Sequence, residues 1–418
     1  MRNYLVPHSP TALLQSRRES ATRRPLDIYI SEMGVSDSHG GGLTLQRVLG
    51  DDLAAITLLI HVSRFATGAP LAPEVRARSL DMPMWLETDG ARALMGCRAA
   101  ALLSEAGVVR KLYARRVANT IAARFGHLLR PLRALVCPQA ASSLYVTEAL
   151  MRRRPLEYAT WIMDDHLVRW NDGAWHYPAG IEELFARHLR GAKSVFVISP
   201  VMKERFQRHF GVESHVLFGP ALAQGAPVWH RRSPQGLARL GYFGALGPWQ
   251  QDALGFLSDC LEPARASLDI YAPSSCAPPA WSSPRVTFKS RIPPCEVPST
   301  MRSYDAVVLP VSFEPGLRHL SEFNIATKMA ECLASGTVTL LVAPRYAAMA
   351  RLLGPRKAAV IVAEKTTDAM VEAVAFACDP AHRRDILRAA SELVSSCLTV
   401  AAMRQIWAGS GPEAPVGS

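Results

Sequence analysis

The sequence predicts an α/β protein made of two open, doubly wound parallel-sheet domains. Short apolar and β-branched runs alternate with helical patterns along most of the chain, as in parallel sheets covered by helices. A stretch rich in proline and glycine, residues 219–236, separates two such series. With 418 residues, the chain is long enough for each domain to bury its own core.

The first domain is predicted over residues 25–222, after a flexible basic tail over residues 1–24. Its first strand follows Pro25 and leads into a glycine-rich loop, and Gly211 is expected to cap the helix before the last strand. The expected strands cover 26–30, 53–62, 158–163, 194–198 and 215–218, and the expected helices cover 43–49, 110–135, 181–191 and 202–210.

A linker over 223–236 leads into the second domain, predicted over 237–396, and a C-terminal helix and tail over 397–418 follow. The expected strands cover 240–244, 268–272, 286–288, 305–309, 338–342 and 359–362, and the expected helices cover 250–261, 296–302, 326–335, 367–378 and 381–396. Ligands of such sheets bind at the carboxyl ends of the strands, so we expect the functional site in the cleft between the domains.

Positive charge is concentrated in the first third of the chain. The net charge is +11, and residues 1–154 hold 21 basic and 12 acidic side chains. This excess favours an anionic partner, although it can also reflect the base composition of a genome. The helix expected over 110–135 is either an ordinary helix with a solvated basic face or one that lies on an anionic membrane surface. No nucleic-acid motif accompanies it, so no nucleic-acid partner is expected.

Other features of the composition indicate the compartment. No run of 18 apolar residues and no secretory signal is evident, so we expect a cytoplasmic protein, with peripheral association at the inner membrane face as an option. None of the eight cysteines forms a C-x-x-C pair, so neither a disulfide framework nor a structural zinc site is expected.

The loop over 38–42, Ser-His-Gly-Gly-Gly, is the first candidate binding element. Glycines allow close backbone approach to an anion, and the following helix offers unpaired N–H groups. The loop is neither G-x-G-x-x-G nor a Walker sequence, so the motif predicts neither dinucleotide nor ATP binding. It is either a phosphate contact or a plain strand-to-helix turn.

The second candidate is the segment 322–336. Lys328 and Glu331 are three residues apart, so they share one face of the expected helix. The lysine could neutralise a phosphate, and the glutamate could accept from both hydroxyls of a ribose. The alternative is a surface ion pair of little energetic weight.

Several segments resemble segments of glycosyltransferase family 4, and they follow one another along the chain in the order found in that family. Residues 331–336 with the strand 338–342 resemble the family segment E-(A/Y)-(M/L)-A-x-G-x-P-V, and 324–328 resemble the S/N-x-P-x-K form of a bacterial branch. Further segments that match are 161–166, 192–199, 240–249 and 291–310. The resemblance covers 155–400 well and 25–60 through the glycine loop, whereas 63–150 gives little signal.

The resemblance implies a GT-B fold, in which two Rossmann-like domains face each other across a cleft. It implies transfer of a sugar, with retention, from a nucleoside-diphosphate sugar to a hydroxyl of a glycan, a lipid-linked molecule or a protein, in bacterial glycan or glycoconjugate synthesis. It implies no metal and no cofactor beyond the sugar nucleotide, because helix dipoles and cationic side chains offset the diphosphate charge.

The resemblance also assigns roles to residues. Glu331 would bind the donor ribose, Lys328 the diphosphate or sugar, and Asp165 or His166 would face the reacting sugar. The expected donor-binding residues are Gly41, Gly42, Gly244, Arg291, Asn324, Ala326, Thr327, Lys328 and Glu331, and the expected catalytic residues are Glu322, Asp165 and His166.

The sequence departs from the family at the first of its paired glutamates. These usually lie eight residues apart, but Phe323 stands eight residues before Glu331, and Glu322 is one position away. A further departure is that no cation follows the strand 240–244, so Lys328 and other cations of the second domain would neutralise the diphosphate. Two alternatives to a transferase stay open: a catalytically degenerate GT-B protein that binds a nucleotide sugar or a protein partner, and a GT-B sugar-nucleotide epimerase.

Overall fold

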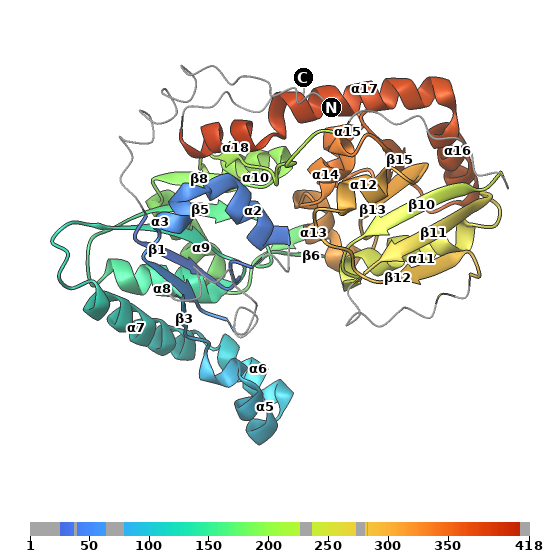
Figure 1. The fold of residues 1–418 in the computed structure, drawn as a ribbon. Helices are drawn as coiled ribbons and strands as arrows, with labels where there is room; N and C mark the ends of the chain where they lie inside the picture. The colour runs from blue at the N-terminus through green and yellow to red at the C-terminus, as the bar shows by residue number, and fades with distance from the viewer. Residues whose placement is uncertain are drawn as a thin grey trace, which may run out of the picture.

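The structure, a computed structural model, describes residues 26–36, 40–63, 79–225, 236–272, 281 and 283–409. The expected tail over 1–24, most of the expected linker, and Ser38 and His39 of the glycine loop lie outside the described residues. The described chain forms two parallel sheets, each covered by helices (Figure 1). This confirms the predicted α/β class.

The first sheet has seven parallel strands in the order β3-β2-β1-β4-β5-β8-β9. The strands are β1 (Ile28–Ser31), β2 (Leu58–His61), β3 (Ser79–Asp81), β4 (Leu132–Cys137), β5 (Leu156–Ile162), β8 (Ser194–Val197) and β9 (His215–Val216). The order reverses between β1 and β4, as in doubly wound sheets, and such a reversal leaves a crevice at the carboxyl ends of these strands. A separate hairpin pairs β6 (Arg169–Asn171) with β7 (Ala174–His176).

Helices cover both faces of this sheet because neighbouring residues of β1 point to opposite sides. Ile28 and Ile30 share a buried cluster with Val117 of α7, whereas Tyr29 packs with Leu45 of α2. The helices of this part are α2 (Gly40–Leu49), α3 (Asp51–Ala55), the short 3-10 helix η1 (Trp85–Glu87), α5 (Asp89–Met95), α6 (Cys97–Glu105), α7 (Gly107–Arg124), α8 (Ala141–Met151), α9 (Ile181–Gly191) and α10 (Pro200–Phe210).

The helix expected over 110–135 is wrong in its second half. The helix α7 ends at Arg124, and Leu132–Cys137 form β4 near the centre of the sheet. Gly126 and Pro131 interrupt the helix, and the apolar residues beyond them belong to the strand. Likewise, the strand expected over 53–62 divides into the helix α3 and the shorter strand β2.

The second sheet has six parallel strands in the order β12-β11-β10-β13-β14-β15. They are β10 (Ala238–Phe243), β11 (Ala266–Tyr271), β12 (Val286–Lys289), β13 (Ala306–Pro310), β14 (Val338–Val342) and β15 (Val360–Val362). The helices are α11 (Pro248–Cys260), α12 (Val297–Met301), the 3-10 helix η2 (Pro315–Leu317), α13 (Arg318–Phe323), α14 (Met329–Ala334), α15 (Ala348–Leu353), α16 (Thr367–Cys378) and α17 (Pro380–Cys397). Each expected strand of this half overlaps an observed one.

The chain then returns to the first sheet. The helix α18 (Val400–Trp407) follows α17 and packs against α2, beside the first domain (Figure 1). Its Trp407 lies 5.1 Å from the Phe196 ring and donates to Asp52 Oδ2 at 2.7 Å. Two segments therefore connect the domains, one before β10 and one between α17 and α18.

Candidate functional site

The glycine end of α2 approaches the second domain closely. A Cβ atom on Gly40 would lie 2.0 Å from Thr327 Oγ1, so the backbone contact requires glycine. Gly42 serves its own loop instead, because a Cβ there would lie 1.9 Å from the Ser36 carbonyl oxygen. Gly41 lies between them in the first turn of α2. The structure thus brings the glycine loop and the 324–328 segment together.

Lys328 is the buried cation of this region. Its Nζ donates to the Phe243 carbonyl oxygen at 2.5 Å, at the end of β10, and lies 5.0 Å from the centre of the Tyr242 ring. Burial lowers the pKa of Lys328 from its usual value. Gly244 has φ of 151°, and a Cβ there would lie 1.6 Å from the ammonium nitrogen. Glycine at 244 therefore makes room for the lysine.

Glu331 belongs to α14, one turn beyond Lys328, and its ion pair reaches the other domain. Its Oε1 accepts from Arg47 Nη2 of α2 at 2.5 Å, and Arg47 Nη1 donates to the Pro220 carbonyl oxygen at 3.0 Å. The helix begins at Met329 rather than at 326, so Lys328 is its N-cap residue. Ala326 accepts from the Met329 N–H at 2.8 Å and so shapes the turn into the helix.

Phe323, eight residues before Glu331, lies in a buried aromatic environment. Phe323 is buried, with its ring centre 4.7 Å from that of Trp175 and the Arg205 guanidinium 4.9 Å away. Its neighbour Glu322 accepts from Arg318 Nε at 2.7 Å within α13. The structure thus pairs Glu322 with Arg318 and places no carboxylate at position 323.

The adjacent carboxylates after β5 have different surroundings. Asp165 caps its own turn, accepting from the Leu167 and Val168 N–H groups and, at 2.9 Å, from the Tyr177 hydroxyl. Asp164 faces the second domain, where its Oδ1 accepts from Asn324 Nδ2 at 2.5 Å. Burial raises the pKa of both carboxyl groups.

His166 lies beside Asp164 at the domain boundary, and His319 of the second domain lies next to His166. His166 is half-buried, its Nε2 is 3.9 Å from Asp164 Oδ2, and its ring centre is 6.5 Å from that of His319 on α13. His319 is buried, and Arg169 Nη1 lies 3.4 Å from its Nε2. Burial and the nearby Arg169 cation lower the pKa of His319 to about 4, so its ring is neutral at pH 7.

The remaining expected residue, Arg291, is exposed after β12, the edge strand of the second sheet and two strands away from β10. Sequence reasoning missed Arg47 as a partner of Glu331 and Asp164 as the carboxylate that faces the second domain. Arg47 gives no local signal, since 284 residues separate it from Glu331. For Asp164, the pair of adjacent aspartates was visible in the sequence. The sequence alone does not say which of the two side chains faces the second domain.

The arrangement suits an anionic ligand with a hydroxylated ring. A buried lysine, a carboxylate and a glycine-lined helix start meet where the carboxyl ends of two parallel sheets face each other. Within the described ranges, no three histidine, cysteine or acidic side chains are grouped as metal ligands would be. No described helix combines the length and the apolar character needed to cross a bilayer.

Comparison with known proteins agrees with this picture. Residues 255–406 match a protein family described as glycosyl transferase-like. Sucrose-phosphate synthase from Thermosynechococcus elongatus is similar in structure with a TM-score of 0.64 and 14% identity, covering 92% of this chain and 98% of that chain. HepE from Anabaena, solved with UDP and glucose, gives 0.60 and 10%, covering 92% and 99%. WaaG, a glycosyltransferase involved in lipopolysaccharide biosynthesis, gives 0.56 and 12%, covering 91% and 98%.

No curated protein sequence matches the chain. The structural similarity nevertheless spans both domains, so the fold is GT-B, two Rossmann-like domains that face each other. The sequence match in the second domain confirms the resemblance to glycosyltransferases.

Proposed function

We propose that the protein transfers a sugar from a nucleoside-diphosphate sugar to an acceptor hydroxyl. The observation that carries the proposal is the meeting of Lys328, Glu331 and the glycine end of α2 at the domain boundary. Lys328 and the backbone of Asn324, Ala326 and Thr327 would hold the diphosphate, and Glu331 would accept from the ribose hydroxyls. Similar solved structures of HepE contain UDP and UDP-glucose, which makes UDP the first nucleotide to test.

The finer parts of the proposal concern the reaction. The transfer would retain the anomeric configuration and move a hexose without a metal, since Lys328 and helix N-termini would offset the diphosphate charge. His166, one of the expected catalytic residues, lies at the boundary beside Asp164, which is the neighbour of the expected Asp165. These two groups would face the reacting sugar. NMR of the product during turnover would show retention, and activity in excess EDTA would show metal independence.

The acceptor side would work at a membrane. The basic side chains of α7 support the proposal that the protein associates peripherally with the cytoplasmic face of an inner membrane. The acceptor would be a glycan, a lipid-linked molecule or a protein in bacterial glycan synthesis. Basic side chains near an anionic surface each contribute about 1 kcal/mol of attraction.

A second candidate is a protein that binds a sugar nucleotide without turning it over. It is favoured by the buried Phe323, which stands where the family has a glutamate, and by Glu322, which is held by Arg318. Turnover of an identified donor would exclude it.

The test is ligand-induced stabilisation of the purified chain by UDP, GDP, dTDP, ADP and CMP, followed by turnover assays with the corresponding sugar nucleotides. A nucleotide at about 100 times its dissociation constant should stabilise the folded state by about 2.7 kcal/mol. Glu331→Gln should abolish the shift, and Glu364→Gln, a change in an exposed ion pair with Arg345, should leave it unchanged. Equal shifts in wild type and Glu331→Gln would contradict the assignment of the ribose carboxylate.

A further inference from the structure

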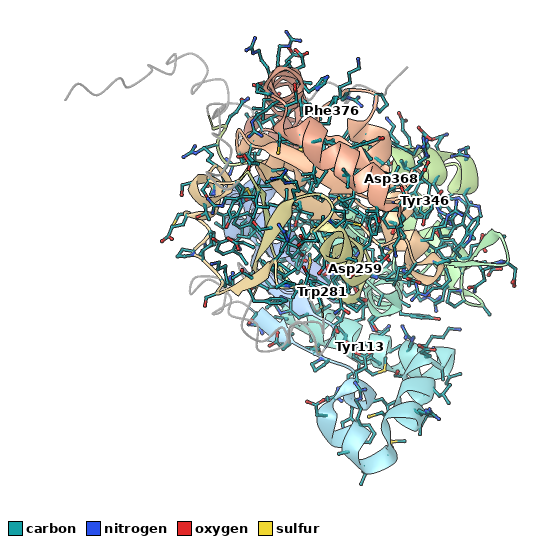
Figure 2. The ribbon with its side chains drawn as sticks, turned by 90° about the vertical axis from the view of Figure 1, so that its right-hand side faces the viewer. Tyr113, Asp259, Trp281, Tyr346, Asp368 and Phe376 are labelled. Atoms are coloured by element: carbon teal, nitrogen blue, oxygen red, sulfur yellow. The ribbon has the colours of Figure 1, made fainter. Side chains whose placement is uncertain are left out.

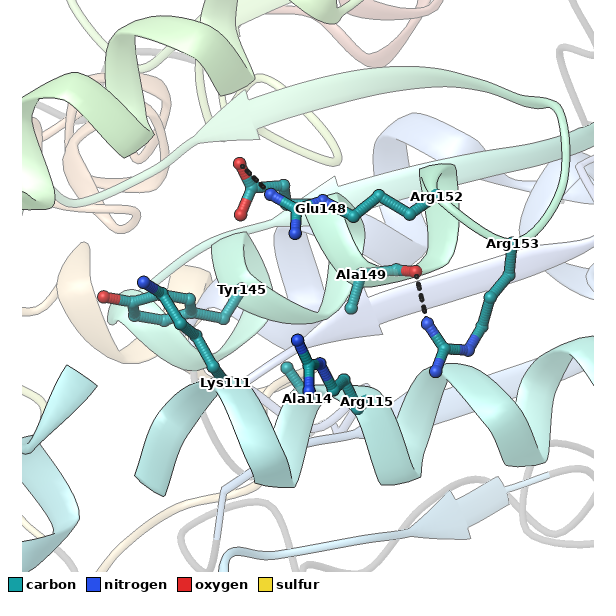
Figure 3. A pocket seen from close by; sticks show the side chains of 8 residues that line it. All are labelled: Lys111, Ala114, Arg115, Tyr145, Glu148, Ala149, Arg152 and Arg153. Carbon is teal, nitrogen blue, oxygen red and sulfur yellow. Dashed lines mark hydrogen bonds and ion pairs between the residues drawn. The ribbon is translucent and has the colours of Figure 1, made fainter. Parts of the chain in front are cut away.

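An open groove of about 340 Å³ lies between α7 and α8, on the face of the first sheet opposite to α2. Lys111 and Arg115 rise from α7 toward α8, and Arg152 and Arg153 extend from the C-terminal end of α8 (Figure 3). The acidic side chain that lines the groove is Glu148, which already pairs with Arg152 at 3.4 Å and with Arg187 at 3.0 Å. The groove therefore has a clear excess of positive charge.

These cations are available to a ligand. Within the described part of the chain, the side chains of Lys111 and Arg115 have no ion pair or hydrogen bond. Two hydrogen bonds hold the Arg153 guanidinium in place. Its Nε donates to Asn119 Oδ1, and its Nη1 donates to the Ala149 carbonyl oxygen at 3.4 Å. Neighbouring cations repel each other, so a multivalent anion such as a phosphate group would relieve the repulsion and accept hydrogen bonds from several donors.

Apolar side chains are exposed beside the groove. Val108 and Leu112 are 71% and 59% exposed, and since they lie one turn apart on α7 they share its outer face with Lys111 and Arg115. Leu102 of α6 and Leu94 of α5 are exposed too. Figure 2 shows α5 and α6 as a projection that stands away from the rest of the molecule, near the labelled Tyr113. Exposed apolar side chains beside cations are typical of a surface with a partner.

We propose that this face binds an anionic phospholipid bilayer, with one lipid phosphate in the groove between α7 and α8. Val108, Leu112 and Leu102 would enter the boundary between headgroups and acyl chains. A phosphorylated ligand free in solution would use the cations but not the exposed apolar side chains, which is why the lipid is the occupant that fits both. The proposal rests on the membrane part of the proposed function and deepens it by naming the residues and the lipid group that meet. Its purpose would be to bring a membrane-borne acceptor to the enzyme.

The position of the projection is consistent with that purpose. The segment from η1 to α7 connects the carboxyl end of β3 to the amino end of β4. The projection therefore begins at the end of the sheet formed by the carboxyl ends of its strands, which is the end where the candidate site lies. Tyr113 holds α7 there, because its hydroxyl donates to the Met82 carbonyl oxygen and lies 3.2 Å from the Val62 carbonyl oxygen. A bilayer on this face would therefore lie close to the carboxyl ends of the first sheet's strands, where the candidate site is.

The experiment is sedimentation of the full chain with vesicles of phosphatidylcholine and with vesicles of phosphatidylcholine mixed with phosphatidylglycerol. Wild type should bind only the anionic vesicles, and the binding should weaken as salt is added. Lys111→Gln/Arg115→Gln should lower the affinity by about tenfold or more, since each cation near an anionic surface contributes to the attraction. Val108→Ser/Leu112→Ser should also weaken binding.

The matched control is Arg384→Gln/Arg388→Gln on α17, which removes two charges at the same spacing from another helix and should leave vesicle binding unchanged. Equal binding by the Lys111→Gln/Arg115→Gln variant and wild type would overturn the proposal. Stabilisation by pyrophosphate in solution without vesicle binding would assign the groove to a soluble phosphate compound and overturn the lipid assignment. Nucleotide-induced stabilisation should persist in the groove variants, so failure of the donor site and failure of this surface are separate results.

Discussion

The Arg47 guanidinium and the Glu331 carboxylate join the two domains through a 2.5 Å ion pair. Arg47 lies near the end of α2, and Glu331 lies in α14 of the other domain. Their side chains are 10% and 27% exposed, so water screens the pair less than it would at an open surface. Because Glu331 is the carboxylate proposed to hold the ribose, this pair links the donor site to the position of the first domain.

Arg47→Ala should therefore lower the free energy of unfolding by about 2 kcal/mol, since a largely buried carboxylate would lose its charged hydrogen-bond donor. Urea denaturation of Arg47→Ala, Glu331→Gln and the double variant would measure the coupling between the two residues. We expect a coupling of about 1–2 kcal/mol.

The exposed pair Arg345–Glu364 is the matched control for this cycle. Its atoms are 2.7 Å apart, but its side chains are 77% and 61% exposed, so its coupling should stay below about 1 kcal/mol. If the effects of Arg47→Ala and Glu331→Gln simply add, the ion pair does not hold the domains together.

Gly40→Ala should push the domains apart, because the new methyl group would meet Thr327 Oγ1 at 2.0 Å. Overpacking of this kind costs about 1–3 kcal/mol. We expect a lower unfolding midpoint and weaker nucleotide-induced stabilisation. Thr327→Ala in the same chain removes the clashing hydroxyl and should restore part of the loss.

Gly90→Ala on α5 is the control for that change, since no heavy atom lies within 4 Å of a Cβ there. Alanine is a better helix former than glycine, so this variant should be as stable as wild type or up to about 1 kcal/mol more stable. Equal effects of Gly40→Ala and Gly90→Ala would mean that the contact with Thr327 is not tight in solution.

The elements of the second domain were predictable because their patterns are local. The strand Val338–Val342 and the helix Thr367–Cys378 have the predicted bounds. A short run of apolar and β-branched residues favours a strand, and a helical periodicity over a longer segment favours a helix. The helix expected over 110–135 failed because the apolar spacing of α7 continues by chance into β4, and periodicity cannot distinguish the two across Gly126 and Pro131.

The candidate site was predictable only in part, for a related reason. The segment with Lys328 and Glu331 could be found because both residues lie in one short motif. Arg47 could not be found, because its contact with Glu331 exists only after both domains have folded and come together. The roles of Asp164 and Asp165 likewise depend on which way a turn faces, and the alternation of a strand does not continue past its end.

The two aspartates should separate stability from activity. Asp165→Ala removes the acceptor of the Tyr177 hydroxyl and of two backbone N–H groups, so it should cost about 2–4 kcal/mol of unfolding free energy. Asp164→Asn keeps an oxygen that can accept from Asn324, so its stability should change by less than about 1 kcal/mol. Transfer activity should nevertheless fall by about tenfold or more if the carboxylate acts on the sugar.

Urea denaturation and donor turnover on the same preparations would measure both effects. If Asp164→Asn is as active as wild type, its carboxylate has only a structural role at the boundary. If Asp165→Ala is as stable as wild type, the turn after β5 does not depend on its cap.

The domain boundary should also weaken in acid because of His319. The pKa of His319 is about 4 in the folded chain and ordinarily 6.5, so the unfolded chain binds more protons between these values. Stability is therefore lost as the pH falls from 6.5 toward 4, by up to about 1.4 kcal/mol per pH unit. The physical cause is that a protonated His319 would be buried beside the Arg169 cation and the His166 ring.

His319→Gln removes the contribution of His319 to the pH dependence of stability. The unfolding free energy of this variant should therefore depend less steeply on pH than that of wild type. The buried His188, whose pKa burial lowers to about 3, contributes in the same direction but is present in both chains, so the difference between them isolates His319. Urea denaturation between pH 7 and pH 4.5 measures it, with His382→Gln, a change of an exposed histidine, as the control. Parallel pH profiles for wild type and His319→Gln would contradict this prediction. They would mean that His319 is already exposed to water when it is protonated, and hence that the domain boundary opens before His319 takes up its proton.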